Sequence, residues 1–149
     1  MFGPYEPSVC LTRLEGLRDG LAGDGWRQAT LVRDFRDIPG DDAYRKSIRA
    51  LYQSDMNLLV FLKGCAEGGV SVEATHVLND SRLVDKSVFL VESDLQRRFI
   101  SELVDDRPEF RKAYHREVIV GNDADLLEQA SGALVSVISR RPFPLNYFK

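Results

Sequence analysis

The chain has 149 residues, of which 44% are hydrophobic and 29% are charged. This composition is ordinary for a globular protein, and it excludes extensive disorder, a collagen-like repeat and a disulfide scaffold. The formal charge of -3 is spread evenly, so no basic region is available to bind a nucleic-acid backbone. The longest apolar run, residues 58–62, is too short for a membrane span, and no signal-peptide pattern opens the chain. We expect a cytoplasmic protein whose Cys10 and Cys65 are reduced.

Helical and strand patterns alternate along the first half of the chain. Leucines spaced three and four apart predict a helix over residues 8–22. Residues 28–35 are a weaker, more polar strand candidate, typical of a sheet edge. A helix over residues 41–54 follows, with Asp41 as its N-cap, and leads to a continuous apolar run at residues 57–63. Such a run predicts a strand that is buried on both faces.

The same alternation continues to residue 139. The predicted elements are a helix over residues 70–80, a strand over 86–92, a shorter helix over 95–104, a strand over 116–120 and a helix over 123–139. The last helix carries a full apolar stripe, and Asn122 precedes it as a cap.

This regular order predicts an α/β fold, with a parallel sheet covered by helices on both faces. We expect a single domain over residues 1–140, a Rossmann-like or flavodoxin-like three-layer sandwich of about five strands in the order 2-1-3-4-5. The first strand would be central, yet only Met1 and Phe2 precede the turn at Gly3-Pro4. Either this strand is very short, or it starts upstream of Met1, or the topology is different.

Ligands of an open parallel sheet bind at the carboxyl ends of its strands, near the switch in strand order. Two turns of this chain are expected there, Gly3-Pro4-Tyr5 and the glycine-rich residues 64–69. The second turn leads into a helix whose first turns carry Ser71 and Glu73. A carboxylate at that position lies near the positive end of the helix dipole, which favours its ionised, nucleophilic form.

Three stretches carry a recognisable pattern. Residues 54–62 contain Asp55 before a strand, residues 68–74 form a G-x-x-x-E helix start, and residues 86–91 begin with Lys86. Together with the Gly-Pro turn at the N-terminus, this pattern resembles the nucleoside 2-deoxyribosyltransferase-like superfamily, which includes the deoxynucleoside 5'-monophosphate N-glycosidases.

The resemblance implies cleavage or transfer at the N-glycosidic bond of a nucleoside or nucleotide, with no cofactor and no metal. Glu73 would attack the anomeric carbon and form a glycosyl-enzyme ester, which water or a second base resolves. Glu67 stands six residues earlier, where phosphate-binding members have Ser, so its charge argues against a 5'-phosphate there. The residues that the resemblance assigns to substrate binding are Gly3, Pro4, Tyr5, Asp55, Glu67, Gly69 and Ser71.

Departures from the family pattern leave an alternative open. Ser47 stands where the family has a second catalytic Asp, and a hydroxyl cannot replace the proton handling of a carboxylate. The alternative function is therefore a non-catalytic nucleotide-sensing or protein-interaction module on the same fold. Glu73 would then be an ordinary carboxylate stabilised by the helix dipole.

The C-terminal segment, residues 141–149, carries four large apolar side chains after the last predicted helix. A solvated tail rarely holds so many. We expect this segment to pack on its own core or on a neighbouring subunit of a homodimer or higher homo-oligomer. By the family resemblance, Asn146 and Tyr147 would reach the partner's site.

Overall fold

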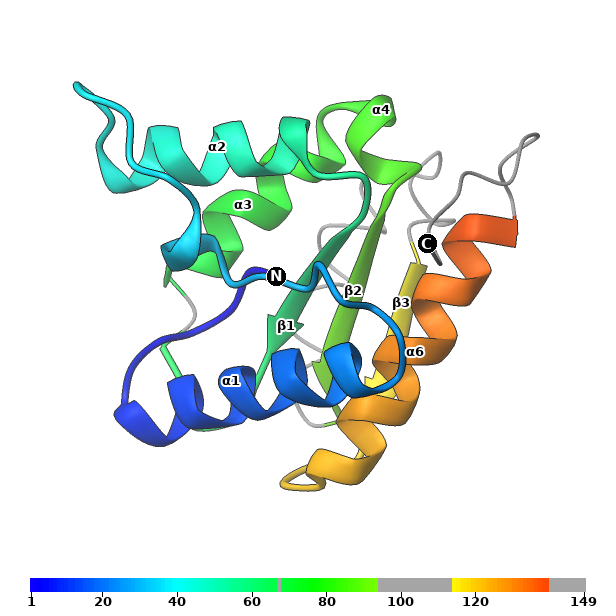
Figure 1. Cartoon of the computed structure of the whole chain (residues 1–149). Coiled ribbons are helices and arrows are strands. Elements are labelled where there is room, and N and C mark those ends of the chain that lie inside the picture. The colour runs from blue at the N-terminus through cyan, green and yellow to red at the C-terminus, as the bar shows by residue number, and fades with distance from the viewer. Residues whose placement is uncertain (67, 94–113, 140–149) are drawn as a thin grey trace.

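The computed structural model describes residues 1–66, 68–93 and 114–139 (Figure 1). Its centre is a parallel sheet of three strands in the order β1-β2-β3, formed by β1 (Asn57–Phe61), β2 (Ser87–Glu92) and β3 (Tyr114–Val118). The helices are α1 (Ser8–Gly23), α2 (Ala43–Gln53), α3 (Gly68–Leu78), α4 (Ser81–Val84) and α6 (Asp123–Ser139), with one 3-10 turn, η1 (Val32–Asp34). The α/β class with parallel strands and alternating helices is therefore as predicted.

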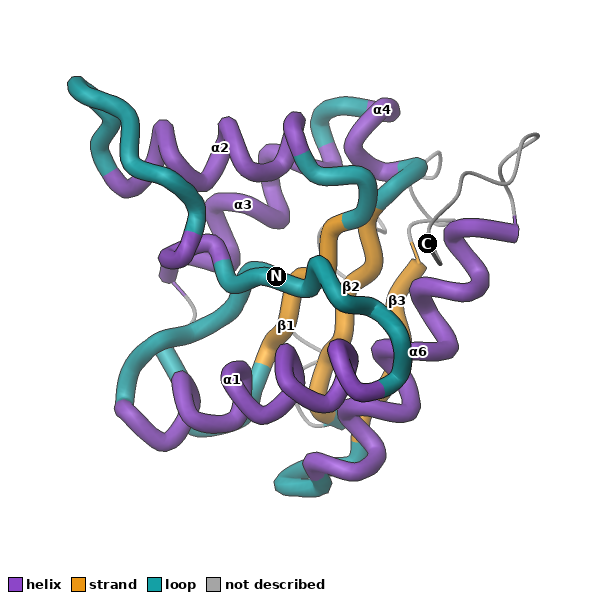
Figure 2. The backbone as a smooth tube through the Cα atoms, in the orientation of Figure 1, coloured by secondary structure: helices purple, strands orange, loops and turns teal. Residues whose placement is uncertain are grey.

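Helices cover both faces of the sheet (Figures 1 and 2). In β1, Leu59 and Phe61 belong to the apolar cluster beneath α2, α3 and α4, whereas Leu58 and Val60 belong to the cluster beneath α1 and α6. Residues of β2 alternate in the same way. Because successive strand residues point to opposite faces, a strand with helices on both sides must be apolar throughout.

The prediction of five strands is wrong for the described residues, which contain three. Residues 28–35 hold only η1 and extended chain. The Phe2 N–H donates to the Leu58 carbonyl (2.8 Å) and the Phe2 carbonyl accepts from Val60 (2.8 Å), so Phe2 makes one isolated parallel bridge to β1. A strand this short offers too few hydrogen bonds to hold residues 28–35 as a further strand.

The order of the segments nevertheless resembles the predicted one. The Met1 amino group donates to the Thr30 carbonyl (2.6 Å), and the Val32 N–H donates to the Met1 carbonyl (3.1 Å). The chain around Thr30 and Val32 thus lies beside Met1, while Phe2 lies beside β1. Met1 and Phe2 occupy the place of a central strand with only two residues.

Of the two N-caps predicted from the sequence, the one for α2 is wrong and the one for α6 is confirmed. Asp42, not Asp41, caps α2, and its carboxylate accepts from the Arg45 N–H (2.7 Å). Asp41 instead pairs with Arg49 (2.9 Å). Asn122 caps α6 as predicted, since its side-chain oxygen accepts from the Asp125 N–H (2.9 Å).

The prediction of two reduced thiols is wrong, because Cys10 and Cys65 form a disulfide with their Cα atoms 6.2 Å apart. The residues are 55 positions apart in the sequence, so their pairing follows only from the packing of α1 against the turn after β1. Disulfides persist in oxidising compartments and are usually transient or regulatory in the cytosol. The cytoplasmic location stays a prediction.

Phe2 should matter for stability far more than a terminal residue usually does. Its side chain is 2% exposed and sits in the cluster beneath α2 and α3. Phe2→Ala should lower the free energy of unfolding by about 3–5 kcal/mol, measured by urea denaturation. The control is Phe35→Ala, whose partly buried ring packs on the same cluster and should cost clearly less. Equal losses for the two variants would show that Phe2 does not anchor the short strand.

Candidate functional site

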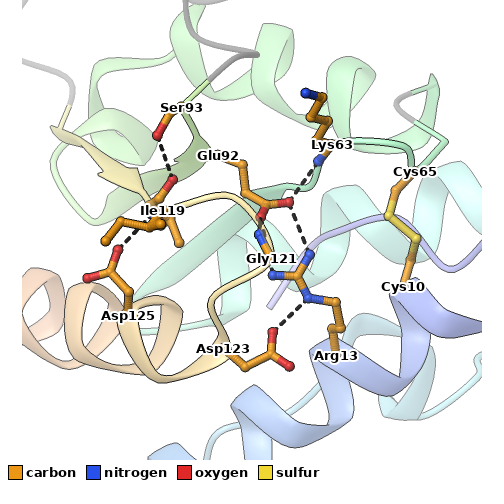
Figure 3. Close-up of polar contacts among 11 residues, drawn as sticks. Cys10, Arg13, Lys63, Cys65, Glu92, Ser93, Ile119, Gly121, Asp123 and Asp125 are labelled. Atoms are coloured by element: carbon orange, nitrogen blue, oxygen red, sulfur yellow. Dashed lines mark hydrogen bonds and ion pairs between the residues drawn. A yellow bond between two sulfur atoms is a disulfide. The ribbon is translucent and has the colours of Figure 1, made fainter.

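The carboxyl edge of the sheet carries a buried carboxylate at its centre (Figure 3). Glu92, the last residue of β2, is 1% exposed. One of its oxygens accepts from the backbone N–H of Lys63 after β1 (2.8 Å), and the other accepts from Gly121 after β3. Arg13 of α1 donates to both oxygens (3.0 and 3.3 Å). We call Arg13, Lys63, Glu92, Gly121 and Asp123 the Glu92 cluster.

The Glu92 cluster fills the place where a parallel sheet often binds an anion. Arg13 also donates to Asp123 in the first turn of α6 (2.7 Å). Asp125 accepts from the Ile119 N–H (2.8 Å) and Asn122 caps the helix, so the protein's own oxygens surround the start of α6. Helix N-termini attract anions through free N–H groups and the helix dipole. At the start of α6, Asn122 occupies the Asp125 N–H, and the Asp123 and Asp125 carboxylates would repel a phosphate.

A second polar group lies on the opposite side of β1. Glu73, in the second turn of α3, is hydrogen-bonded to Ser47 of α2. Tyr5, after the short first strand, is close enough for the Glu73 charge to affect its acidity. The Tyr5 hydroxyl oxygen also accepts from the Arg33 N–H (3.2 Å). We call Tyr5, Ser47 and Glu73 the Glu73 group.

Burial controls the acidity of the Glu73 group. It raises the pKa of Glu73, while the hydrogen bond from Ser47 and the Met1 amino group oppose the rise. Burial also raises the pKa of Tyr5, and the nearby Glu73 charge adds to this effect against the hydrogen bond from Arg33. The sequence position of Glu73 predicts that the helix dipole favours its ionised form, whereas removal of the carboxyl group from water acts in the other direction and raises its pKa.

The structure brings some of the predicted substrate residues together. Gly3 and Pro4 form the turn after Phe2, and a Cβ at Gly3 would lie 2.9 Å from a Leu14 methyl group, so the turn packs tightly on α1. Gly69 and Ser71 lie in the first turn of α3, ahead of Glu73. Glu67, Asn146 and Tyr147 lie outside the described residues.

Asp55 is separated from this group. It precedes β1, at the amino edge of the sheet, and lines a cavity of about 690 Å³ together with Met1, Trp26 and Thr30. That volume suits a small ligand. Neither Tyr5 nor Glu73 lines it. Because parallel sheets bind ligands at the carboxyl edge, we give the Glu73 group more weight than this cavity.

Sequence reasoning missed Arg13 and Glu92. No local pattern in α1 or in the apolar strand that ends in Glu92 indicates that the Arg13 and Glu92 side chains meet. The sequence offered one signal, which is that Glu92 ends a strand that is otherwise apolar. A carboxylate that is buried at such a position needs a hydrogen-bonding or charged partner.

Among the described residues, no group of three His, Cys, Asp or Glu side chains could hold a metal ion. His76, one turn after Glu73, contacts the Tyr52 hydroxyl (3.3 Å) instead. Within residues 1–66, 68–93 and 114–139, no helix is long and apolar enough to cross a membrane.

Comparison with protein-family models, with curated proteins and with solved structures finds no match for this chain. The family resemblance therefore depends on the residues quoted above, and the function must be argued from the site.

Removing only one partner of the Arg13–Glu92 pair should lower the free energy of unfolding strongly. Arg13→Met leaves a buried carboxylate without its cation and should lower the free energy of unfolding by about 3–5 kcal/mol. Arg13→Met combined with Glu92→Gln should lose less than Arg13→Met alone, because no buried charge remains. Urea denaturation of the variants checks both statements.

The control for this pair is Arg18→Met, since Arg18 pairs with the exposed Asp19 (3.0 Å). An exposed ion pair contributes about 0–1 kcal/mol. If Arg13→Met costs no more than Arg18→Met, Glu92 does not depend on Arg13.

Glu73→Gln should stabilise the protein in a pH-dependent way. Burial raises the pKa of Glu73 above 4.5, so the folded state binds this proton more tightly than the unfolded chain. Stability then falls as the pH rises from 4.5 through the raised pKa of the folded state. Glu73→Gln should melt at a higher temperature than the parent at about pH 7, and the difference should disappear near pH 4. Glu128→Gln, at an exposed position on α6, should show no such difference.

Proposed function

We propose that the protein cleaves or transfers at the N-glycosidic bond of a nucleoside-like substrate, with Glu73 as the nucleophile. The observation that carries this proposal is the contact between Glu73 and Ser47. Counting along the sequence assigns Ser47 to the position of the family's second catalytic carboxylate. A contact between the two side chains is what that assignment requires.

Two further features support the same site. Glu73 lies in the helix that follows β1, on the side of the sheet where the Phe2 bridge and the turn at Gly3 lie. Loops after the short first strand and after β1 diverge to opposite faces, which is the arrangement at a switch point. The charge of Glu73 also reaches Tyr5, whose pKa it helps to raise.

The reaction would proceed in two displacements. The Glu73 carboxylate attacks the anomeric carbon, and the base departs with the electron pair of the N-glycosidic bond and takes a proton from water. Water, or the ring nitrogen of a second base, then displaces the ester and restores the free carboxylate.

A second candidate function is ligand binding without turnover. Ser47 favours it, because the described residues provide no second carboxylate beside Glu73 to move a proton during base departure. Stabilisation in a thermal-shift screen with nucleosides, in the absence of any released base, would support this candidate.

The direct test is an incubation with deoxynucleosides, ribonucleosides and their 5'-monophosphates, followed by chromatography of the free base. We expect base release from a nucleoside, and Glu73→Ala should lower the rate by at least about a hundredfold. Glu128→Ala, which removes an exposed carboxylate on α6, should leave the rate unchanged. Absence of base from every substrate, or full activity of Glu73→Ala, would contradict the proposal.

Ser47→Asp tests the role of the missing carboxylate. Under the proposal, this variant supplies a proton-handling group beside Glu73 and should increase base release by at least about tenfold. Ser47→Asn is the matched control, because its amide has a similar shape and does not titrate. Equal rates for the two variants would exclude proton handling at position 47 as the limiting feature.

A further inference from the structure

The cavity at the amino edge of the sheet lies apart from the two polar groups described above. Its volume of about 690 Å³ is within the range of small-molecule sites. One wall is formed by residues 25–30, in the loop that turns back from the end of α1 toward the N-terminus (Figure 2), and the other by residues 53–56, between α2 and β1. Neither Glu73 nor Glu92 is among the lining residues.

The inner surface of the cavity is apolar. Leu21 of α1, Leu58 of β1 and Leu134 of α6 line it, and all three belong to the buried cluster beneath α1 and α6. Trp26, which is 9% exposed, and the partly buried Met56 belong to the same cluster and extend this surface. A flat apolar group that packs here would be removed from water, and this removal favours binding in proportion to the area buried.

The rim of the cavity is polar but carries no net charge. Among the described lining residues, Arg27 is the one basic side chain and Asp55 is the one acidic side chain. Burial lowers the pKa of the Met1 amino group to about 5, so this group adds no charge at neutral pH. The rim also supplies amide and hydroxyl groups, from Gln28, Thr30, Gln53 and Ser54.

Hydrogen bonds hold both walls in place. On one side, the Lys86 ammonium group donates to the carbonyls of Tyr52 and Ser54 (2.9 and 2.6 Å). On the other side, the Trp26 N–H donates to the Leu21 carbonyl (2.9 Å). The cavity therefore needs little ordering when a ligand binds, which lowers the entropic cost of binding.

We propose that this cavity binds a small uncharged aromatic molecule that carries hydrogen-bonding groups. The ring would pack on the apolar inner surface, and the polar groups would bond to the amides and hydroxyls of the rim. An ion of either sign would lose its hydration without gaining a net opposite charge, so it should bind more weakly. The proposal goes beyond the glycosidic function, because the lining shares no residue with the Glu73 group.

The test uses the single tryptophan of the chain, Trp26, as a reporter inside the cavity. Its indole N–H gives one cross-peak in a proton–nitrogen correlation spectrum, and a titration follows the shift of that peak. The probes are naphthalene-2-carboxamide, naphthalene-2-carboxylate and 2-naphthylmethylammonium, which share a ring system and differ in charge. We expect the amide to bind saturably with a Kd below about 1 mM, and the two ions to bind at least about tenfold more weakly. No saturable shift with the amide, or equal affinity for all three probes, overturns the proposal.

Substitutions in the lining check where the probe binds. Ala29→Phe adds a ring to the cavity wall and should weaken binding of the amide at least about tenfold. Ala124→Phe, the same change at an exposed position on α6, should leave the affinity unchanged. If Ala29→Phe does not fold, Ser54→Phe narrows the cavity from the other wall and keeps the carbonyl that Lys86 binds. Parental affinity in a folded variant of the lining overturns this location.

Glu73→Ala separates this proposal from the proposed function. The variant should bind the amide as tightly as the parent protein, because Glu73 does not line the cavity. Loss of amide binding in Glu73→Ala would mean that the probe occupies the Glu73 group, and it would overturn the separate site. If the protein binds the amide as expected and releases base from no nucleoside, the proposed function fails while the cavity proposal holds.

Discussion

The fold depends on one buried carboxylate and its partners. Glu92 ends the central strand of the three, and it binds the backbone N–H groups that follow both neighbouring strands as well as the guanidinium of Arg13. An isolated carboxylate in this position would be strongly unfavourable, and the four donors are what make its burial possible. In return, Glu92 fixes the ends of β1 and β3 and ties α1 to the same edge of the sheet.

This arrangement decides which part of the carboxyl edge can bind a ligand. The side of the edge near β3 and α6 is filled by Glu92, Asp123 and Asp125, so its hydrogen-bonding and electrostatic demands are met within the protein. The other side, between the Phe2 bridge and α3, holds the Glu73 group. Its main carboxylate is half-buried, has a raised pKa and is bonded to a neutral hydroxyl. Perturbed carboxyl groups of this kind cluster at functional sites.

The brevity of the first strand explains the contacts around it. With only two residues, the segment from Met1 to Phe2 cannot hold its neighbours by a ladder of backbone hydrogen bonds. Burial of the Phe2 ring, close packing of Gly3 on Leu14 and the disulfide at Cys10 stabilise this region instead.

The sequence by itself determined the α/β class, the two buried strands β1 and β2, and the helices α3 and α6. It placed the third strand two residues too late, at residues 116–120 instead of 114–118, because the apolar pair Ile119 and Val120 looks buried in the sequence but is exposed after the end of β3. Runs such as residues 58–62 are apolar at every position, which favours a strand covered on both faces. It also determined the cap at Asn122 and the position of Glu73 early in a helix, because both are local features. It failed at residues 28–35, where the β-branched and aromatic residues favour a strand but no full-length neighbour is present to pair with them.

Only the tertiary structure decided which distant side chains meet. The pairs Arg13–Glu92, Cys10–Cys65 and Ser47–Glu73 join residues that no local pattern connects. The tertiary structure also separated Asp55 from Glu73, since the start and the end of β1 lie at opposite edges of the sheet. The sign of the Glu73 pKa shift likewise depends on burial, a property of the packed molecule that the position of Glu73 in the sequence does not show.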